Sequence, residues 1–183
     1  NPPYSAGQKK ANDNNQNEKY PHLDARLKST YVSHSSATRK GSLYDSYVRA
    51  IRWASDRVKD SGVIAFVSNG SFIDGNAADG LRKCLVDEFS KLYVYNLRGN
   101  QTNTVGEKSR REGGKIFGSG SRTPIAICVL VKDPSHTGEA ILRYRDIGDY
   151  LTRKEKLGII EWEGSIANTE WEVIVPNEAA DWI

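Results

Sequence analysis

The sequence contains little of what secreted, metal-binding or membrane proteins need. Its 183 residues include only two cysteines and three histidines, too few for a disulfide framework and without the spacing of metal ligands. No run reaches the roughly 18 apolar residues of a membrane helix, and no basic stretch followed by an apolar one marks a signal peptide. We therefore expect a cytoplasmic protein with no resident metal and no membrane contact.

Methionine is also absent, both at the start of the chain and within it. The chain opens instead on Asn1-Pro2-Pro3-Tyr4, a stiff segment with exposed carbonyl groups that is a candidate for an active site. Together these features indicate a piece excised from a longer protein. A hydrophobic content of 38% is enough to build the core of one domain.

Basic charge is concentrated in one glycine-rich segment. Arg98–Arg122 holds six Lys or Arg against two Glu, whereas Asp133–Ile183 holds eleven Asp or Glu against five Lys or Arg. Such a segment can contact phosphates, although a solvated loop has this composition about as often. Contacts with the phosphates of double-stranded DNA would supply affinity without reading sequence. The candidates for them are Lys108, Arg110, Arg111, Lys115 and Arg122.

Hydrophobic periodicity predicts alternating helices and strands. Ser42 and Asp45 resemble a capping box at the start of an amphipathic helix, and the apolar stripe behind them extends this helix to Lys59. Two more helices are expected, at His22–Tyr31 and Ala77–Glu88. Strands are expected at Val63–Val67, Lys91–Leu97 and Pro124–Val131, with an edge strand at Ala140–Tyr144.

This order predicts an α/β fold, a partial Rossmann-like sheet with flanking helices. Leu97 and Pro124 are joined by a loop with no crossover helix, and parallel neighbours need a crossover. The two strands that they bound should therefore be antiparallel. Residues 148–183 carry three tryptophans without periodicity, and we expect an irregular extension there.

The opening tetrapeptide suits one kind of chemistry. An exocyclic aromatic amine is a poor nucleophile because its lone pair is delocalised into the ring. The Asn1 side-chain oxygen and the Pro2 carbonyl can accept hydrogen bonds from such an amine, and Tyr4 can stack on the base. A base within a duplex must first be flipped out into a pocket of this kind.

Four stretches in order resemble the gamma class of adenine-N6 DNA methyltransferases, particularly those of type IIG and type ISP restriction-modification enzymes. They are Asn1–Tyr4, Ser42–Tyr47, Ser61–Ser68, and Ile116–Phe117 followed by Pro124–Ile127. The resemblance implies that S-adenosylmethionine is the cofactor. Residues 1–147 would then be the C-terminal part of a methyltransferase catalytic domain.

The same resemblance implies roles for individual residues. Asn1, Pro2 and Tyr4 would activate and hold the adenine, with Asn1 also at the cofactor, and Phe117 would stack on the other face of the base. Leu43 and Tyr47 would line the cofactor pocket, although core packing alone explains their helical spacing.

Other parts of the family's enzymes have no match in this chain. The glycine-rich cofactor loop would lie upstream, a target-recognition domain downstream, and nuclease and helicase domains elsewhere in the polypeptide. The chain alone is therefore expected to be inactive.

Two alternatives remain open. The same tetrapeptide serves methyltransferases that act on protein glutamine or on RNA amino groups, and the chemistry does not separate these acceptors from DNA. The chain could also be a non-catalytic module that docks on DNA.

Overall fold

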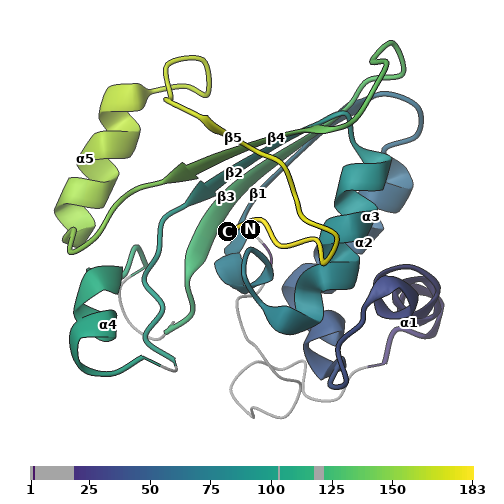
Figure 1. Ribbon diagram of the computed structural model, residues 1–183, viewed down its shortest axis with the longest axis horizontal. Coiled ribbons are helices and arrows are strands. Elements are labelled where there is room, and N and C mark those ends of the chain that lie inside the picture. The colour runs from purple at the N-terminus through teal and green to yellow at the C-terminus, as the bar shows by residue number, and fades with distance from the viewer. Residues whose placement is uncertain (1, 3–18, 103, 118–121) are drawn as a thin grey trace.

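The computed structural model describes residues 2, 19–102, 104–117 and 122–183, which form an α/β structure around one mixed sheet (Figure 1). The strand order is β1-β3-β2-β4-β5. The strands are β1 (Gly62–Asn69), β2 (Lys91–Asn96), β3 (Ile125–Lys132), β4 (Ile141–Asp146) and β5 (Glu172–Ile174). Strand β3 is antiparallel to both β1 and β2, whereas β2 and β4 are parallel. The predicted antiparallel pairing across the glycine-rich segment is confirmed.

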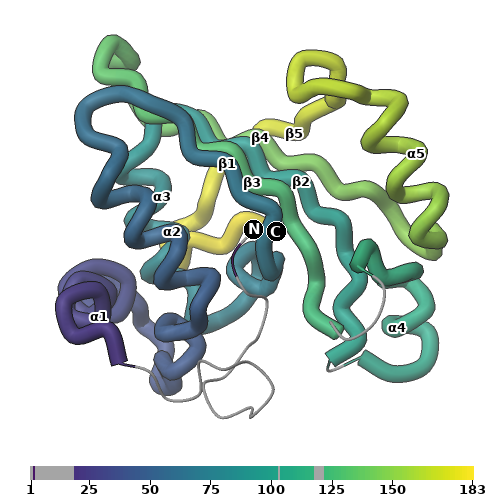
Figure 2. Tube along the Cα trace, turned by 180° about the vertical axis from the view of Figure 1, so that it is seen from behind, coloured from purple at the N-terminus to yellow at the C-terminus, as the bar shows by residue number. Residues whose placement is uncertain are grey.

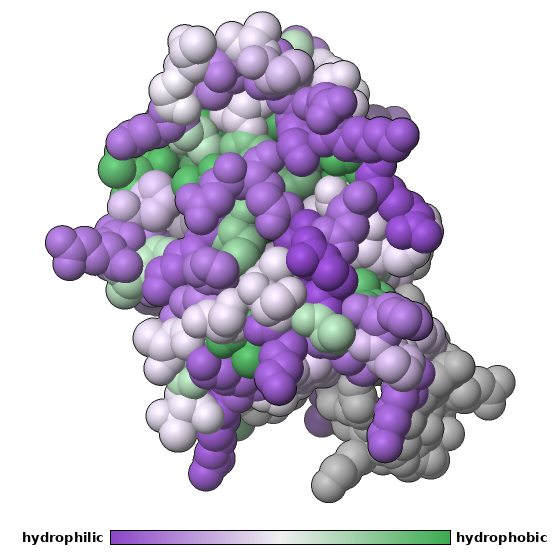
Figure 3. All heavy atoms as spheres, turned by 90° about the vertical axis from the view of Figure 1, so that its right-hand side faces the viewer, coloured by the Kyte–Doolittle hydropathy of each residue, from purple (hydrophilic) through white to green (hydrophobic). Residues whose placement is uncertain are grey.

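Helices cover both faces of this sheet. They are α1 (Pro21–Leu27), α2 (Ser46–Arg57), α3 (Asp79–Glu88), α4 (Gly106–Glu112) and α5 (Arg153–Glu163). Helices α2 and α3 pack on one face and α5 lies on the other (Figure 1), while α4 lies beyond the ends of β2 and β3 (Figure 2). The outer side of the α1–α3 layer is mostly hydrophilic (Figure 3). Within the described ranges, no helix is long and apolar enough to cross a membrane.

The alternation of β3 builds two apolar clusters, because successive side chains of a strand point to opposite faces. Ala126, Cys128 and Leu130 are almost completely buried in the larger cluster, which includes α2 and α3. Ile125 belongs to a smaller cluster with Tyr95 of β2 on the other face. Since both faces are covered, the strand is apolar from Ile125 to Val131.

The predicted helix over Ser42–Lys59 is interrupted at its start. Gly41–Tyr44 forms a 3-10 turn, and Asp45 is extended, with φ −65° and ψ 150°. Helix α2 therefore begins at Ser46, with Asp45 rather than Ser42 at its N-cap. The expected capping box at Ser42 is wrong, because an extended residue stands between that serine and the helix.

The C-terminal region differs from the irregular extension expected for it. Thr152 and Glu155 form a capping box that starts α5, and Gly164 ends this helix in the left-handed conformation. Strand β5 pairs with β4, which therefore lies inside the sheet and not at its edge. Sequence patterns did not predict β5 because three residues are too few to show a strand periodicity. Only its pairing with β4 identifies it as a strand.

The chain end returns to the α3 side of the sheet and closes the larger cluster. Trp182 is 2% exposed and meets the ring of Phe72 edge-on, with centroids 6.1 Å apart. Arg82, which is also buried, donates hydrogen bonds to the carbonyl oxygens of Phe72, Gly75 and Ala180. A buried guanidinium thus joins the chain terminus to the helical layer.

Helix α3 lies so close to the π-helical turn Lys28–Val32, which continues α1, that only glycine fits at the contact. A Cβ on Gly80 would lie 2.0 Å from the Tyr31 carbonyl oxygen, whereas a Cβ on Gly158 of α5 would meet nothing within 4 Å. We expect Gly80→Ala to lower the free energy of unfolding by about 1–3 kcal/mol because the helices must separate. Gly158→Ala, the matched control, should raise it by about 0.5–1 kcal/mol through helix propensity. Urea unfolding measures both, and equal effects would contradict this packing.

Candidate functional site

Several sequence-predicted site residues lie near one end of the sheet. Strands β1, β2 and β4 run in the same direction, so their carboxyl ends lie together beside the amino end of β3. In open α/β sheets, ligands bind at the carboxyl ends of such strands. The segment between β2 and β3 extends from this end (Figure 2).

That segment was expected to be a loop, but it contains α4. This helix of seven residues carries Lys108, Arg110 and Arg111, all exposed, and none of its residues is buried. Lys115 is half-buried just after the helix, and Arg122 is exposed before β3. The structure therefore places four of the five predicted phosphate contacts on the surface.

A buried lysine fixes the base of this segment. Lys156 of α5 is 0% exposed, and its Nζ donates to the carbonyl oxygens of Leu97, at 2.8 Å, and Glu112, at 2.7 Å. The Glu112 carboxylate in turn accepts the backbone N–H groups of Gly99 and Asn100. The end of β2, the end of α4 and the first turns of α5 are thereby joined.

Arg98 is basic but already paired. Its guanidinium contacts both carboxylate oxygens of Asp146 at 2.6 Å and also pairs with Asp149. The pairing with Asp146 raises the pKa of Arg98. It also lowers the pKa of Asp146, against the opposing effect of burial. Arg98 therefore stabilises the turn after β2 and is a poor candidate for DNA contact.

Phe117 stands beside a buried neighbour. Its side chain is 38% exposed, whereas Ile116 is 6% exposed and packs in the smaller apolar cluster. A narrow hollow bounded by Arg98, Lys115 and Phe117 leaves no room for a water molecule between the described residues. Phe117 is therefore partly accessible, and its stacking on a base stays a prediction.

The two predicted cofactor residues lie in the core. Leu43 is 1% exposed and Tyr47 is 4% exposed, both in the larger apolar cluster. Burial raises the pKa of the Tyr47 phenol. Core packing accounts for both side chains, and contact with a cofactor stays a prediction.

The tetrapeptide is covered only in part. Asn1 and Tyr4 lie outside the described residues, and Pro2 is buried. The roles expected of Asn1 and Tyr4 at the adenine therefore stay predictions. Among the described residues, no three His, Cys, Asp or Glu side chains gather as metal ligands.

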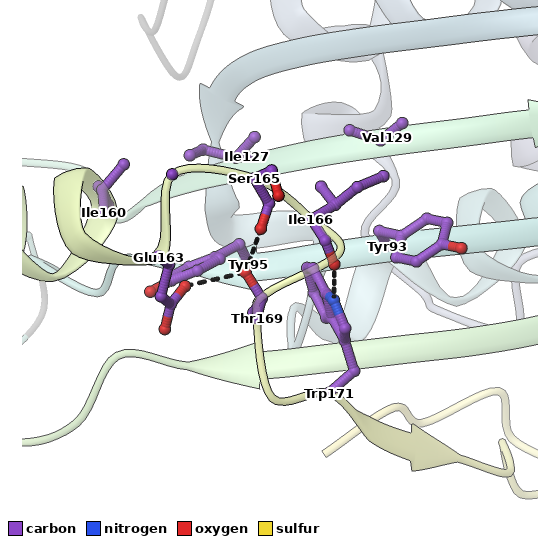
Figure 4. A pocket seen from close by; sticks show the side chains of 11 residues that line it. Tyr93, Tyr95, Ile127, Val129, Ile160, Glu163, Ser165, Ile166, Thr169 and Trp171 are labelled. Atoms are coloured by element: carbon purple, nitrogen blue, oxygen red, sulfur yellow. Dashed lines mark hydrogen bonds between the residues drawn. The ribbon is translucent and has the colours of Figure 1, made fainter.

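An apolar pocket of about 150 Å³ lies on the α5 face of the sheet, where sequence patterns indicated no site (Figure 4). Tyr93 and Tyr95 form its floor, and Trp171 meets both rings edge-on. Hydrogen bonds from Trp171 to the Ile166 carbonyl and from Thr169 to Glu163 hold its rim. None of the predicted site residues lines this pocket.

No protein-family model matches the chain, and no curated protein matches it. Solved structures do. A nuclease-deletion mutant of the type ISP restriction-modification enzyme LlaGI, in complex with a DNA substrate mimic, is 57% identical with a TM-score of 0.92. The ATP-dependent type ISP restriction-modification enzyme LlaBIII, bound to DNA, is 44% identical with a TM-score of 0.92. DrdV, in complex with DNA, is 39% identical with a TM-score of 0.88.

The chain is similar along its whole length to one part of type ISP restriction-modification enzymes. Each of these similarities covers 100% of this chain. The chain spans 14% of the LlaGI chain, 12% of the LlaBIII chain and 17% of the DrdV chain. The resemblance to type ISP enzymes that the motifs predicted is confirmed.

Lys156 should make stability depend on pH. Burial lowers the pKa of its ammonium from 10.5 to about 8, so between these values the unfolded chain binds more protons there than the folded chain. The contribution of Lys156 to the free energy of unfolding therefore rises with pH across this window. Lys156→Met should cost about 1–3 kcal/mol, since two carbonyls lose their donor, and the deficit should widen from pH 7 to pH 10.

Urea unfolding at several pH values measures this deficit. Lys154→Met removes the same charge from an exposed position of α5 and should show little pH dependence. A deficit for Lys156→Met that stays constant or narrows with rising pH would contradict the assignment.

Proposed function

We propose that this chain supplies the C-terminal part of the catalytic domain of a cytoplasmic restriction-modification polypeptide that methylates N6 of adenine in DNA. The observation that carries the proposal is the 57% identity and TM-score of 0.92 to LlaGI over the whole chain, combined with the Asn-Pro-Pro-Tyr opening. The mixed sheet, with antiparallel β3 between two strands of common direction, is consistent with a Rossmann-like methyltransferase sheet.

In this proposal the tetrapeptide acts on the amino group of the base. The Asn1 side-chain oxygen and the Pro2 carbonyl accept its two N–H groups, which makes the nitrogen more tetrahedral and more nucleophilic. Tyr4 stacks on one face of the flipped adenine and Phe117 on the other. The 38% exposure of Phe117 is consistent with this role.

S-adenosylmethionine would supply the methyl group. The described residues do not form a complete site for it, because Leu43 and Tyr47 are already packed in the core. These two side chains could only support the site from the core side. The remaining contacts with the cofactor would come from an upstream half with the glycine-rich loop. The edge of β1 supports such a partner, since among the described strands β1 pairs only with β3 and an open apolar edge favours pairing.

The other parts of the polypeptide are inferred from its relatives. The mutant of LlaGI lacks a nuclease and LlaBIII is ATP-dependent, which favours nuclease and helicase domains. A downstream target-recognition domain follows only from the resemblance of the motifs. All three relatives were determined with DNA or a DNA mimic. This favours double-stranded DNA over protein glutamine or RNA as the acceptor, and it is equally compatible with a non-catalytic docking module.

A chimaera tests the catalytic role directly. Nuclease-deleted LlaGI carrying this chain in place of its matching segment should transfer labelled methyl groups to duplex DNA, and not to RNA or protein. Asn1→Ala should lower the rate by about 100-fold, because the reacting amine then has one hydrogen-bond acceptor fewer. Asn14→Ala, in the polar stretch after the tetrapeptide, should leave the rate unchanged. Undiminished transfer by Asn1→Ala would refute the role, and a chimaera that binds DNA without transfer would favour docking alone.

The exposed basic residues of α4 should contribute to DNA affinity through phosphates. Removing one cation that neutralises a phosphate should reduce the slope of log K against log salt by about 0.9. We therefore expect Lys108→Ala and Arg110→Ala each to flatten the slope in the same chimaera, without changing sequence preference. Lys28→Ala, at an exposed lysine directly after α1, serves as the control. Fluorescence anisotropy over a salt series measures the slopes, and equal slopes for all variants would exclude phosphate contact by α4.

A further inference from the structure

The chain segment that leads to Phe117 is held by residues more than thirty positions downstream. The Arg153 Nε donates to the Ile116 carbonyl oxygen at 2.7 Å. Two backbone hydrogen bonds flank this contact, from Gly114 N to the Leu151 oxygen and from Tyr150 N to the Arg111 oxygen, both 2.8 Å. The start of α5 thus lies along the segment from α4 to Phe117.

Two glycines make this approach possible. A Cβ on Gly113 would lie 2.2 Å from the Leu151 carbonyl oxygen, and a Cβ on Gly114 would lie 2.5 Å from the Arg153 nitrogen. Backbone therefore packs directly on backbone, which no other residue type permits. The glycines that gave this segment the composition of a loop instead dock it on α5.

The docking element is itself rigid. The Thr152 hydroxyl accepts the Glu155 N–H, and the Glu155 carboxylate accepts the Thr152 N–H at 2.7 Å, so the first turn of α5 is closed. One turn later, Lys156 is buried against the Leu97 and Glu112 carbonyls. Arg153 lies in this first turn, between the N-cap Thr152 and the buried Lys156.

We propose that Arg153 is a positioning residue for Phe117. The carbonyl that it holds belongs to the peptide unit joining Ile116 to Phe117, and a planar peptide has no internal freedom. Holding its oxygen while the Ile116 side chain is buried fixes the plane of this peptide. It thereby fixes the position of the Phe117 Cα, from which the ring projects. The ring is then ready to stack on an extruded adenine before the DNA arrives. This inference rests on the proposed function.

The experiment uses the nuclease-deleted LlaGI chimaera with two DNA duplexes. One has 2-aminopurine at the target adenine, and its fluorescence rises when the base is extruded. The other keeps the adenine and reports methyl transfer, because 2-aminopurine has no N6 amino group. The fluorescence readout needs no methyl donor. Arg153→Met should lower the extruded fraction and the kcat of methyl transfer by about 3- to 10-fold, the effect of one hydrogen bond. Arg153→Lys, which can still donate to the Ile116 oxygen, should restore most of both. The neighbouring Lys154→Met removes the same charge and should change neither.

Phe117→Ala separates the possible outcomes. If it lowers base extrusion and Arg153→Met does not, the positioning role is overturned and the proposed function stands. If Arg153→Met lowers Tm and activity together and Arg153→Lys restores neither, the residue is merely structural and the inference fails. If the unsubstituted chimaera binds DNA but neither extrudes the base nor transfers methyl groups, the proposed function itself fails.

Discussion

The structure at the carboxyl end of the sheet depends on one buried ammonium. Removing a charged amine from water is costly unless its N–H groups find acceptors. Lys156 finds two, the carbonyls of Leu97 and Glu112. These acceptors belong to the end of β2 and the end of α4, so satisfying the charge requires both to meet α5. A segment with no buried residue in its own helix is thereby given a fixed position.

The charged side chains of the segment between β2 and β3 fall into two groups, those paired within the molecule and those exposed on α4. Arg98 is committed to Asp146 and Asp149, and Glu112 accepts two backbone N–H groups. Lys108, Arg110 and Arg111 remain on the surface of α4. The acidic excess of the C-terminal region is partly used inside the molecule, since Glu163 is 4% exposed and paired with Arg145. A basic surface on α4 thus persists in the segment that leads to Phe117.

The two faces of the sheet are packed differently and have different roles. One face carries α2 and α3 over the larger cluster and is sealed by Trp182 at the chain terminus. The other carries α5, whose far end borders the apolar pocket at Tyr93, Tyr95 and Trp171 and whose first turn holds the peptide before Phe117. A single helix therefore links the packing of this second face to the candidate base-stacking residue.

Local pattern determined much of this protein. The apolar runs of β1 and β3, the stripe of α2 and the missing crossover after Leu97 follow from side-chain periodicity and chain geometry, and they predicted the α/β class and the antiparallel pair. The tetrapeptide and its neighbours likewise indicated the type ISP resemblance. Tertiary structure alone decided that β4 is internal, that Leu43 and Tyr47 are core residues, and that Gly113 and Gly114 dock on α5. Each of these depends on a partner distant in the sequence, and periodicity within one segment carries no information about what packs against it.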